Sequence, residues 1–293
     1  MKRWRHAVTT ALTAALTAAA VAASMPAMAE IDVYALWDYG QPAASEQRFR
    51  AALAGASGDD ELILRTQIAR SYSLRKRFDE ANAELDAIAP RLAAAGPAAR
   101  VHALLERGRT LRSGGGAADA RPLFVEAFEL AQGHGLEFLA ADALHMVALV
   151  ETGLDGQIEW NRRTAEYARA ARDPRAQGWA AAAYNNLGVA LNEAGRHEEA
   201  LAALEQALAA HERKGKAPEI RIARWMVAHT QRLLGRADEA LAGQLALERE
   251  CADAGEPDPY VFEELALLYA ARGDEARAAH YRTLQRQSQP APN

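Results

Sequence analysis

Residues 184–207, which read YNNLGVALNEAGRHEEALAALEQA, decide the fold of this chain. Two alanine-rich runs, each with apolar residues at helical spacing, flank a glycine turn, so the stretch predicts a pair of antiparallel helices. Gly188 in the first run and Ala200 in the second are small, which lets the two backbones approach closely. Tyr184 and Leu187 are placed to fill the space around that contact.

The same turn recurs along the chain. In each copy, a glycine or a charged residue is followed by polar residues and then by an alanine that opens a helix. The copies lie at residues 77–81, 116–120, 195–200, 235–240 and 273–278. One helical hairpin cannot bury its apolar face alone, whereas stacked hairpins bury a continuous core. The recurrence therefore predicts an array of repeats.

The repeats set the expected domain organisation. Aligning the turns places repeat starts at Leu62, Val101, Ala141, Ala181, Arg221 and Pro259, so successive starts lie 38 to 40 residues apart. We expect a signal peptide over 1–29, a leading segment with an unpaired helix over 30–61, six repeats over 62–286 and a flexible tail over 287–293. The repeat near Ala141 fits least well, because Trp160 or Asn161 stands where a small residue belongs.

At these positions the chain resembles the tetratricopeptide repeat family. The family pattern asks for an aromatic residue, Leu-Gly three residues later, and small residues in the second helix, and residues 184–207 meet it. The resemblance implies an all-α fold, a right-handed superhelical solenoid of antiparallel helix pairs. The family period is about 34 residues, so the extra residues here are expected between repeats. The side chains expected to pack the pairs together are Gly108, Ala120, Tyr184, Leu187, Gly188, Ala200, Ala207, Ala240 and Ala278.

Composition supports the helical prediction and excludes some functions. Half of the 293 residues are hydrophobic but only 6% are aromatic, so alanine and leucine, which favour helices, fill the core. Cys251 is the only cysteine, so no disulfide can form within the chain. Without residues 1–29, 31 Lys+Arg stand against 39 Asp+Glu, a formal charge of −8. Such an acidic chain repels polyanions, which argues against a nucleic-acid partner.

The first 29 residues have the pattern of a secretory signal. A basic start that includes Lys2 precedes a weakly apolar stretch over 7–23, and the small residues Ala27 and Ala29 follow. We expect cleavage after Ala29, which would give a periplasmic or secreted protein with no stable membrane insertion after cleavage. The alternatives are a retained membrane anchor, or a cytosolic regulator whose N-terminus is not a signal.

Sequence motifs for catalysis or cofactor binding are missing. The chain has no glycine-rich phosphate loop, no His-Glu-x-x-His motif and no Gly-x-Ser-x-Gly motif. We therefore expect no catalytic residue, no cofactor and no metal. The alternative is a hydrolase-like enzyme around Asp142, His145 and Glu151, since the first two lie three apart on one helical face. The simpler interpretation makes Asp142 and His145 a surface ion pair on a groove wall, and Glu263 and Glu264 a solvated face.

The resemblance also implies a binding surface. In the family, the first helix of each repeat lines a concave groove, so we expect a non-catalytic interaction or scaffold module that binds a peptide or partner protein there. The residues expected to line this groove are Asp142, His145, Asn185, Asn186, Val189, Asn192, Trp225, His229, Arg232, Tyr260 and Glu263.

Two parts of this groove have expected roles. Trp225, His229 and Arg232 share one helical face, so Trp225 could anchor an apolar side chain and Arg232 an acidic group of the partner. The alternative is that Trp225 packs between neighbouring repeats. Arg109 and other arginines of the earlier repeats should make the N-terminal end of the groove basic. The carboxylate clamp of the family's chaperone adaptors is absent, because only Asn186 matches it.

Overall fold

The computed structural model of the chain describes residues 31–288, and within that range it contains only helices. The predicted signal peptide and its cleavage site lie outside the described residues. So does most of the predicted tail, although Gln287 and Ser288 belong to the last helix. No helix in the described range is long and apolar enough to cross a membrane.

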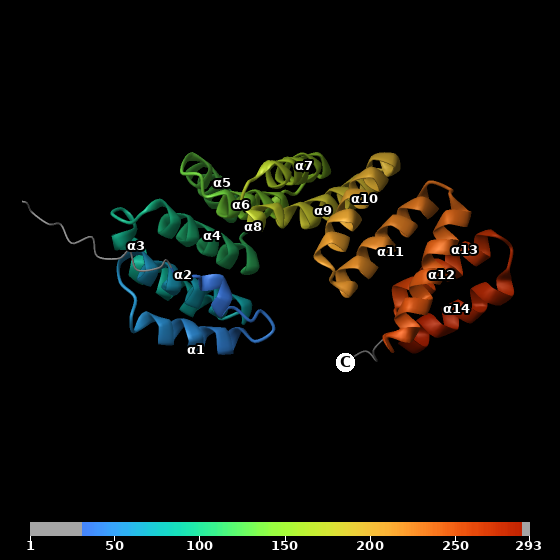
Figure 1. Cartoon of the computed structure of the whole chain (residues 1–293), viewed down its shortest axis with the longest axis horizontal. Coiled ribbons are helices and arrows are strands. Elements are labelled where there is room, and N and C mark those ends of the chain that lie inside the picture. Colours follow the sequence, from blue (N-terminus) through green and yellow to red (C-terminus); the bar gives the residue numbers. More distant parts are fainter. Residues whose placement is uncertain (1–30, 289–293) are drawn as a thin grey trace, which may run out of the picture. The chain divides into compact units, whose positions relative to one another are not determined.

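Twelve of the helices form six consecutive pairs (Figure 1). The prediction of an all-α array of helix pairs is confirmed, and each expected repeat start lies inside the first helix of a pair. The pairs are α2 (Gly58–Leu74) with α3 (Phe78–Leu92), α4 (Pro97–Ser113) with α5 (Ala117–Gly133), α6 (Glu137–Val150) with α7 (Leu154–Ala170), α9 (Trp179–Glu193) with α10 (His197–Lys214), α11 (Ala217–Leu233) with α12 (Ala237–Asp253), and α13 (Pro259–Ala271) with α14 (Glu275–Ser288).

In every pair except the third, the turn between the two helices contains one residue with left-handed backbone conformation. Gly195 has φ +72° and ends α9 with a hydrogen bond from its N–H to the Asn192 carbonyl, at 3.0 Å. Glycine adopts this conformation without a steric penalty from a Cβ atom. In the first pair, the equivalent turn uses Lys76, which has φ +60°.

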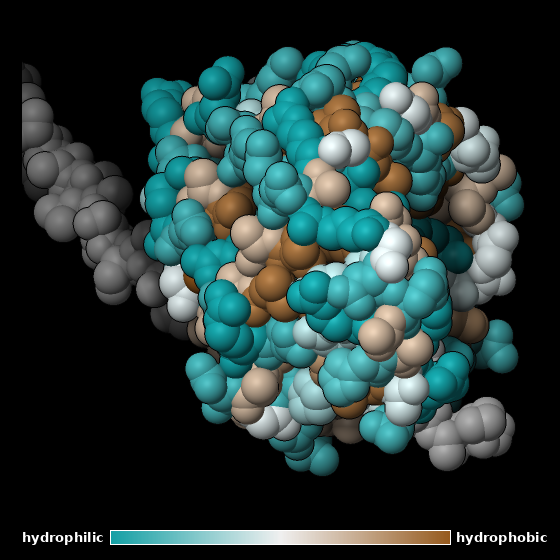
Figure 2. Space-filling model, turned by 90° about the vertical axis from the view of Figure 1, so that its right-hand side faces the viewer, coloured by the Kyte–Doolittle hydropathy of each residue, from teal (hydrophilic) through white to brown (hydrophobic). Residues whose placement is uncertain are grey.

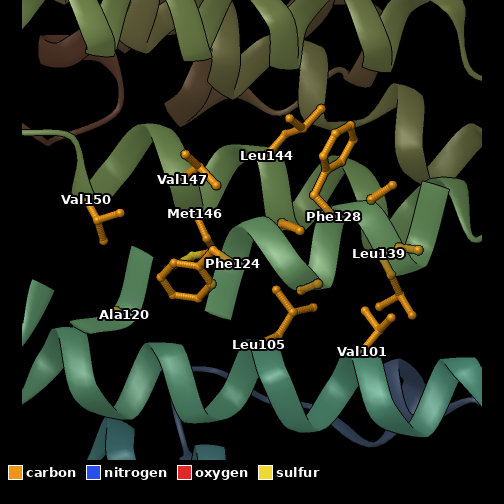
Figure 3. Close-up of a cluster of buried hydrophobic side chains, with 14 residues drawn as sticks. Val101, Leu105, Ala120, Phe124, Phe128, Leu139, Leu144, Met146, Val147 and Val150 are labelled. Atoms are coloured by element: carbon orange, nitrogen blue, oxygen red, sulfur yellow. The ribbon is translucent and has the colours of Figure 1, made fainter. Parts of the chain in front are cut away.

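Small residues allow the two helices of a pair to touch. A Cβ atom added to Gly108 would lie 2.5 Å from Cε1 of Phe124, and one added to Gly188 would lie 2.4 Å from Cγ of Leu204. Phe124 is fully buried in the cluster that joins α4, α5 and α6, which Figure 3 shows in close-up. The predicted packing residues Ala120, Ala200, Ala207, Ala240 and Ala278 are all fully buried.

Three helices lie outside the six pairs. One is the leading helix α1 (Pro42–Leu53), which packs along α2 and buries the whole side chain of Phe49. Ahead of it is a short 3-10 helix, η1 (Val33–Leu36). The third, α8 (Pro174–Gln177), was not predicted; it begins where the Asp173 carboxylate accepts a hydrogen bond from the Arg175 N–H.

The irregular third pair accommodates a polar residue at its contact. Asn161, and not Trp160, is the buried residue of the two, with 4% of its surface exposed. Its Nδ2 donates to the Gln157 carbonyl at 2.8 Å. This bond inside α7 satisfies the amide nitrogen, whereas Oδ1 of Asn161 is buried without a hydrogen-bond partner in the described chain.

Candidate functional site

The inner faces of α6, α9 and α11 enclose an open groove of about 400 Å³. The groove brings together three residues that the sequence predicted for it, His145, Asn185 and Asn186. It also contains two polar residues that the sequence did not predict for it, His211 and Glu219. His211 lies on α10, a second helix, whereas the prediction considered only the first helix of each pair, and Glu219 lies in the first turn of α11, ahead of the predicted repeat start at Arg221. The full lining is His145, Leu149, Ala182, Asn185, Asn186, His211, Glu219 and Ile222.

The groove combines free amides with exposed apolar side chains. Within the described chain, Asn185 and Asn186 make no side-chain hydrogen bond. Leu149 is 38% exposed and Ile222 is 58% exposed, although the surface in the view of Figure 2 is mostly hydrophilic. An amide both donates and accepts hydrogen bonds, so this lining can hold a polypeptide backbone beside an apolar side chain.

The imidazole of His145 forms part of the groove wall. Its ring lies 4.8 Å from the ring of Trp179 between centroids, and its Nδ1 is buried without a partner in the described chain. Burial lowers the pKa of His145 despite the nearby Asp142 carboxylate, and burial together with Lys214 lowers the pKa of His211. Both imidazoles are therefore neutral at pH 7, and the groove is suited to uncharged groups.

The three residues of the hydrolase alternative do not form one site. Asp142 is buried and accepts a hydrogen bond from Arg109, so it is not half of a surface ion pair with His145. Glu151 accepts from Nε of Arg121 at 2.6 Å. No cluster of three or more His, Cys, Asp or Glu side chains between residues 31 and 288 could hold a metal ion.

Several predicted groove residues instead bind one another. Glu264, expected on a solvated face, is only 3% exposed and accepts two hydrogen bonds from Arg232, at 2.7 and 2.9 Å. The His229 ring lies 2.9 Å from the same carboxylate. Arg232 is therefore already paired and is not free for an acidic group of a partner. Its exposed neighbour Glu263 remains solvated.

The remaining predicted groove residues are divided between packing and solvent. Trp225 stacks on His229 with centroids 5.0 Å apart and packs against the buried cluster of α12, α13 and α14. The Asn192 amide donates to the Thr230 hydroxyl at 2.7 Å, so it holds α9 to α11. Val189 is half-buried, whereas Tyr260 is 63% exposed.

The N-terminal part of the inner surface is covered by the chain itself. Residues Val33–Tyr39 lie against α2, α4 and α6, with Tyr34 4.9 Å from Phe138 between ring centroids. Beneath the segment, Arg70 pairs with Glu106, and Arg109 pairs with both Glu106 and Asp142. Arg70 and Arg109 are neutralised, so these two arginines do not make this end of the groove basic as the sequence suggested. The leading segment showed no repeat pattern that could have placed it there.

Burial also affects a histidine in this region. His102 is 6% exposed, and burial lowers its pKa to about 4, although Glu106 and Asp142 act in the opposite direction. The Gln67 amide nitrogen lies 3.3 Å from Nδ1 of His102, which fits a neutral ring that accepts this bond. Arg109 and Arg70 further oppose protonation.

We expect acid to destabilise the protein through His102. The folded-state pKa lies below the unfolded value of about 6.5, so the stabilisation is complete above that value and is lost as the pH falls toward 4. Between pH 7 and pH 5, the free energy of unfolding should drop by about 2 kcal/mol from this group. Urea unfolding at both pH values measures the drop, and His102→Asn, which cannot titrate, should reduce it. An equal drop in the variant would contradict the assignment.

Comparisons with known proteins agree with the repeat architecture. A family model described as tetratricopeptide repeat matches residues 179–242, which contain α9, α10 and α11. No curated protein sequence matches the chain significantly.

Solved structures share the fold at low sequence identity. A signal transduction ATPase with a tetratricopeptide repeat sensor, from Pyrococcus horikoshii, matches with a TM-score of 0.70 and 12% identity over 85% of this chain, which spans only 39% of that protein. The apo form of RapI gives a TM-score of 0.69 and 11% identity, covering 87% of this chain and 76% of that one. NprR in complex with its cognate peptide NprX gives a TM-score of 0.50 and 16% identity, covering 87% of this chain and 75% of that one.

At these identities the solved structures establish the fold alone. The family match identifies tetratricopeptide repeats over residues 179–242, and the rest of the described chain has the same helix-pair fold as the solved tetratricopeptide repeat structures.

Proposed function

We propose that this protein is a non-catalytic interaction module that binds an extended peptide segment of a partner protein in the groove between α6, α9 and α11. The observation that carries the proposal is the pair of unpartnered amides, Asn185 and Asn186, between the exposed side chains of Leu149 and Ile222. Two amides can bond to the main chain of the peptide, while the aliphatic residues cover one of its apolar side chains.

The charge of the groove limits which peptide segments it can bind. Both imidazoles of the lining are neutral at pH 7, and Glu219 is the only carboxylate among the lining residues. The groove therefore favours main-chain amides and an aliphatic side chain over a terminal carboxylate. That NprR, a protein of the same fold, has been solved with its cognate peptide supports a peptide as the ligand class.

Two further features belong to the same proposal. A non-catalytic role is supported by the separate pairing of Asp142 and Glu151 with different arginines, which leaves no acid and base together at His145. An exported location is supported only by the signal pattern of residues 1–29. The acidic net charge favours a protein partner over a nucleic acid.

We expect the double substitution Asn185→Ala and Asn186→Ala to weaken peptide binding about ten-fold or more. Each neutral hydrogen bond contributes about 0.5–1.5 kcal/mol, and the two amides act together. Peptides selected from a displayed random library on the protein provide the ligand, and fluorescence anisotropy measures their Kd. The melting temperature should stay unchanged, because neither amide bonds to the described chain.

Matched controls separate the groove from the rest of the surface. Gln206→Ala removes an exposed amide from α10, and Leu74→Asp alters a 50% exposed leucine at the end of α2. Neither should change the Kd, whereas Ile222→Asp should weaken binding. If the selected peptides bind the double variant and the wild type equally, the groove is not their site and the proposal is wrong.

A further inference from the structure

We propose that the inner faces of α2, α4 and α6 form a second peptide site, which the chain's own Val33–Tyr39 segment occupies. In this proposal the site accepts a partner segment with two aromatic side chains three positions apart when the resident segment is displaced. The inference does not depend on the open groove between α6, α9 and α11, because it concerns different wall residues.

The resident segment is bound through its two aromatic side chains. Tyr34 lies edge-on to Phe138 of α6, with ring centroids 4.9 Å apart, and 6.1 Å from the ring of His102 on α4. Three residues later, Nε1 of Trp37 donates to Oε1 of Gln67 on α2, at 2.9 Å. Val33, beside Tyr34, is only 3% exposed. The segment thus reaches three successive repeats, as a peptide ligand of such a surface would.

The segment is not an ordinary structural helix of the array. η1 has only four residues, and a helix of this length has too few backbone hydrogen bonds to be stable alone. Side-chain contacts with the wall therefore hold it in place, and a segment supplied by another protein can reproduce such contacts. At its C-terminal end, the Asp38 N–H donates to the Ser45 hydroxyl at 2.8 Å, which ties the segment to α1.

The wall keeps unused hydrogen-bonding capacity beneath the resident segment. Nε of Arg70 and Oε2 of Glu106 are buried without a hydrogen-bond partner in the described chain. Arg70 also lies under both rings of the segment's C-terminal end, 5.7 Å from Trp37 and 5.3 Å from Tyr39. Since unpaired buried polar atoms are costly, a partner segment that supplies a donor or an acceptor here would bind better than the resident one.

A series of rings joins this wall to the open groove. Phe138, which contacts Tyr34, lies 6.4 Å from Trp179 between centroids, and Trp179 lies 4.8 Å from His145 in the open groove. The occupied and open parts of the inner surface are therefore continuous. The same surface already binds a peptide segment at one end, which supports a peptide as the occupant when the resident segment leaves.

The resident segment competes with any free peptide for the inner faces of α2, α4 and α6, and an experiment must remove this competition. Being covalently attached, it is present at an effective concentration that a free peptide rarely reaches. The test therefore uses the full chain with Tyr34→Ser and Trp37→Ser, which removes both anchors but leaves the wall intact. The probe is a fluorescein-labelled peptide of residues 31–39, IDVYALWDY, and fluorescence anisotropy measures its Kd.

We expect the double variant to bind this peptide at least ten-fold more tightly than the wild type does. A control variant, Trp160→Ser with Tyr260→Ser, removes the same residue types from other surfaces and should bind like the wild type. Tyr34→Ser alone is measured in parallel, so the comparison stands even if the double variant loses helicity. Two results would overturn the proposal: equal binding of the peptide to the wild type and to all variants, or no binding to either variant that lacks Tyr34.

A double-mutant cycle then locates the peptide on the wall. In the variant with Tyr34→Ser and Trp37→Ser, Gln67→Ala should weaken binding of the peptide about five-fold to ten-fold, because the indole N–H of the peptide's tryptophan loses its acceptor. The same substitution should leave a peptide with phenylalanine in place of tryptophan unaffected. An equal effect on both peptides would mean that the peptide is bound elsewhere, and the site would be rejected.

Discussion

Replacing Arg109 with methionine is expected to lower the free energy of unfolding by about 3–5 kcal/mol. The guanidinium lies between Glu106 and Asp142 and donates to both carboxylates, while its side chain is only 12% exposed. Methionine fills much of the same volume but leaves two carboxylates, 1% and 6% exposed, with only Arg70 to compensate them. Chemical denaturation of the wild type and the variant measures the difference.

A surface ion pair provides the control for Arg109. Arg272 pairs with Asp238, but the two side chains are 36% and 95% exposed. Water screens such a pair, so Arg272→Met should change stability by less than about 1 kcal/mol. If both substitutions cost equally little, the carboxylates around Arg109 must be hydrated, contrary to the burial described above.

The arginines near Asp142 lower the pKa of its carboxyl group. Burial would raise the pKa of this carboxyl, but Arg109 and Arg70 outweigh burial and hold the pKa below its ordinary value. Asp142 is therefore a structural anion, and this explains why it cannot serve as the base of a hydrolase beside His145. A carboxylate with a lowered pKa is a poor proton acceptor at neutral pH.

The contacts within each helix pair could be predicted from the sequence. Gly188 and Ala200 are close in the chain, and the turn between them fixes how their helices meet. Spacing alone therefore placed Gly188 at a helix contact, and in the structure Gly188 lies against Leu204. The same reasoning placed Gly108 at a helix contact, and in the structure Phe124 lies against it. Both predictions needed only helical periodicity and one turn, which are local properties.

The contacts between repeats could not be predicted in the same way. Glu263 and Glu264 are neighbours, yet the first is exposed and the second binds Arg232 from the previous repeat. A helix turns by about 100° per residue, so a register error of one residue exchanges their environments. The sequence did contain a signal for contacts between repeats. Oppositely charged residues on the first helices of successive pairs lie one repeat apart, as Arg109 and Asp142 do.

The resident segment escaped prediction for a different reason. Val33–Tyr39 has no helical periodicity and no equivalent in the other repeats, and its contacts with Gln67, His102 and Phe138 span three helices. Such contacts depend on the assembled surface, not on any local pattern. The sequence therefore could not show that the chain itself covers this part of the inner surface.

Replacing Gly188 with leucine is expected to lower the free energy of unfolding by about 3 kcal/mol. Even the first added atom, Cβ, would lie 2.4 Å from Cγ of Leu204, and Leu204 is fully buried, so it has no space into which to move. Helices α9 and α10 would have to separate. By comparison, Gly195→Ala adds a Cβ with no atom within 4 Å and costs only the strain of φ +72°, about 1 kcal/mol.

A second substitution tests the cause of this loss. If the clash with Leu204 is responsible, Leu204→Ala should cost much less in a Gly188→Ala background than in the wild type, because it removes the clashing side chain together with its packing. The positive coupling distinguishes a steric conflict from a general effect on α9. As a further control, Gly133→Ala places a Cβ in open space at the end of α5 and should not destabilise the protein. Additive losses at Gly188 and Leu204 would mean that the two residues do not define the contact, and the register assigned to this repeat would have to change.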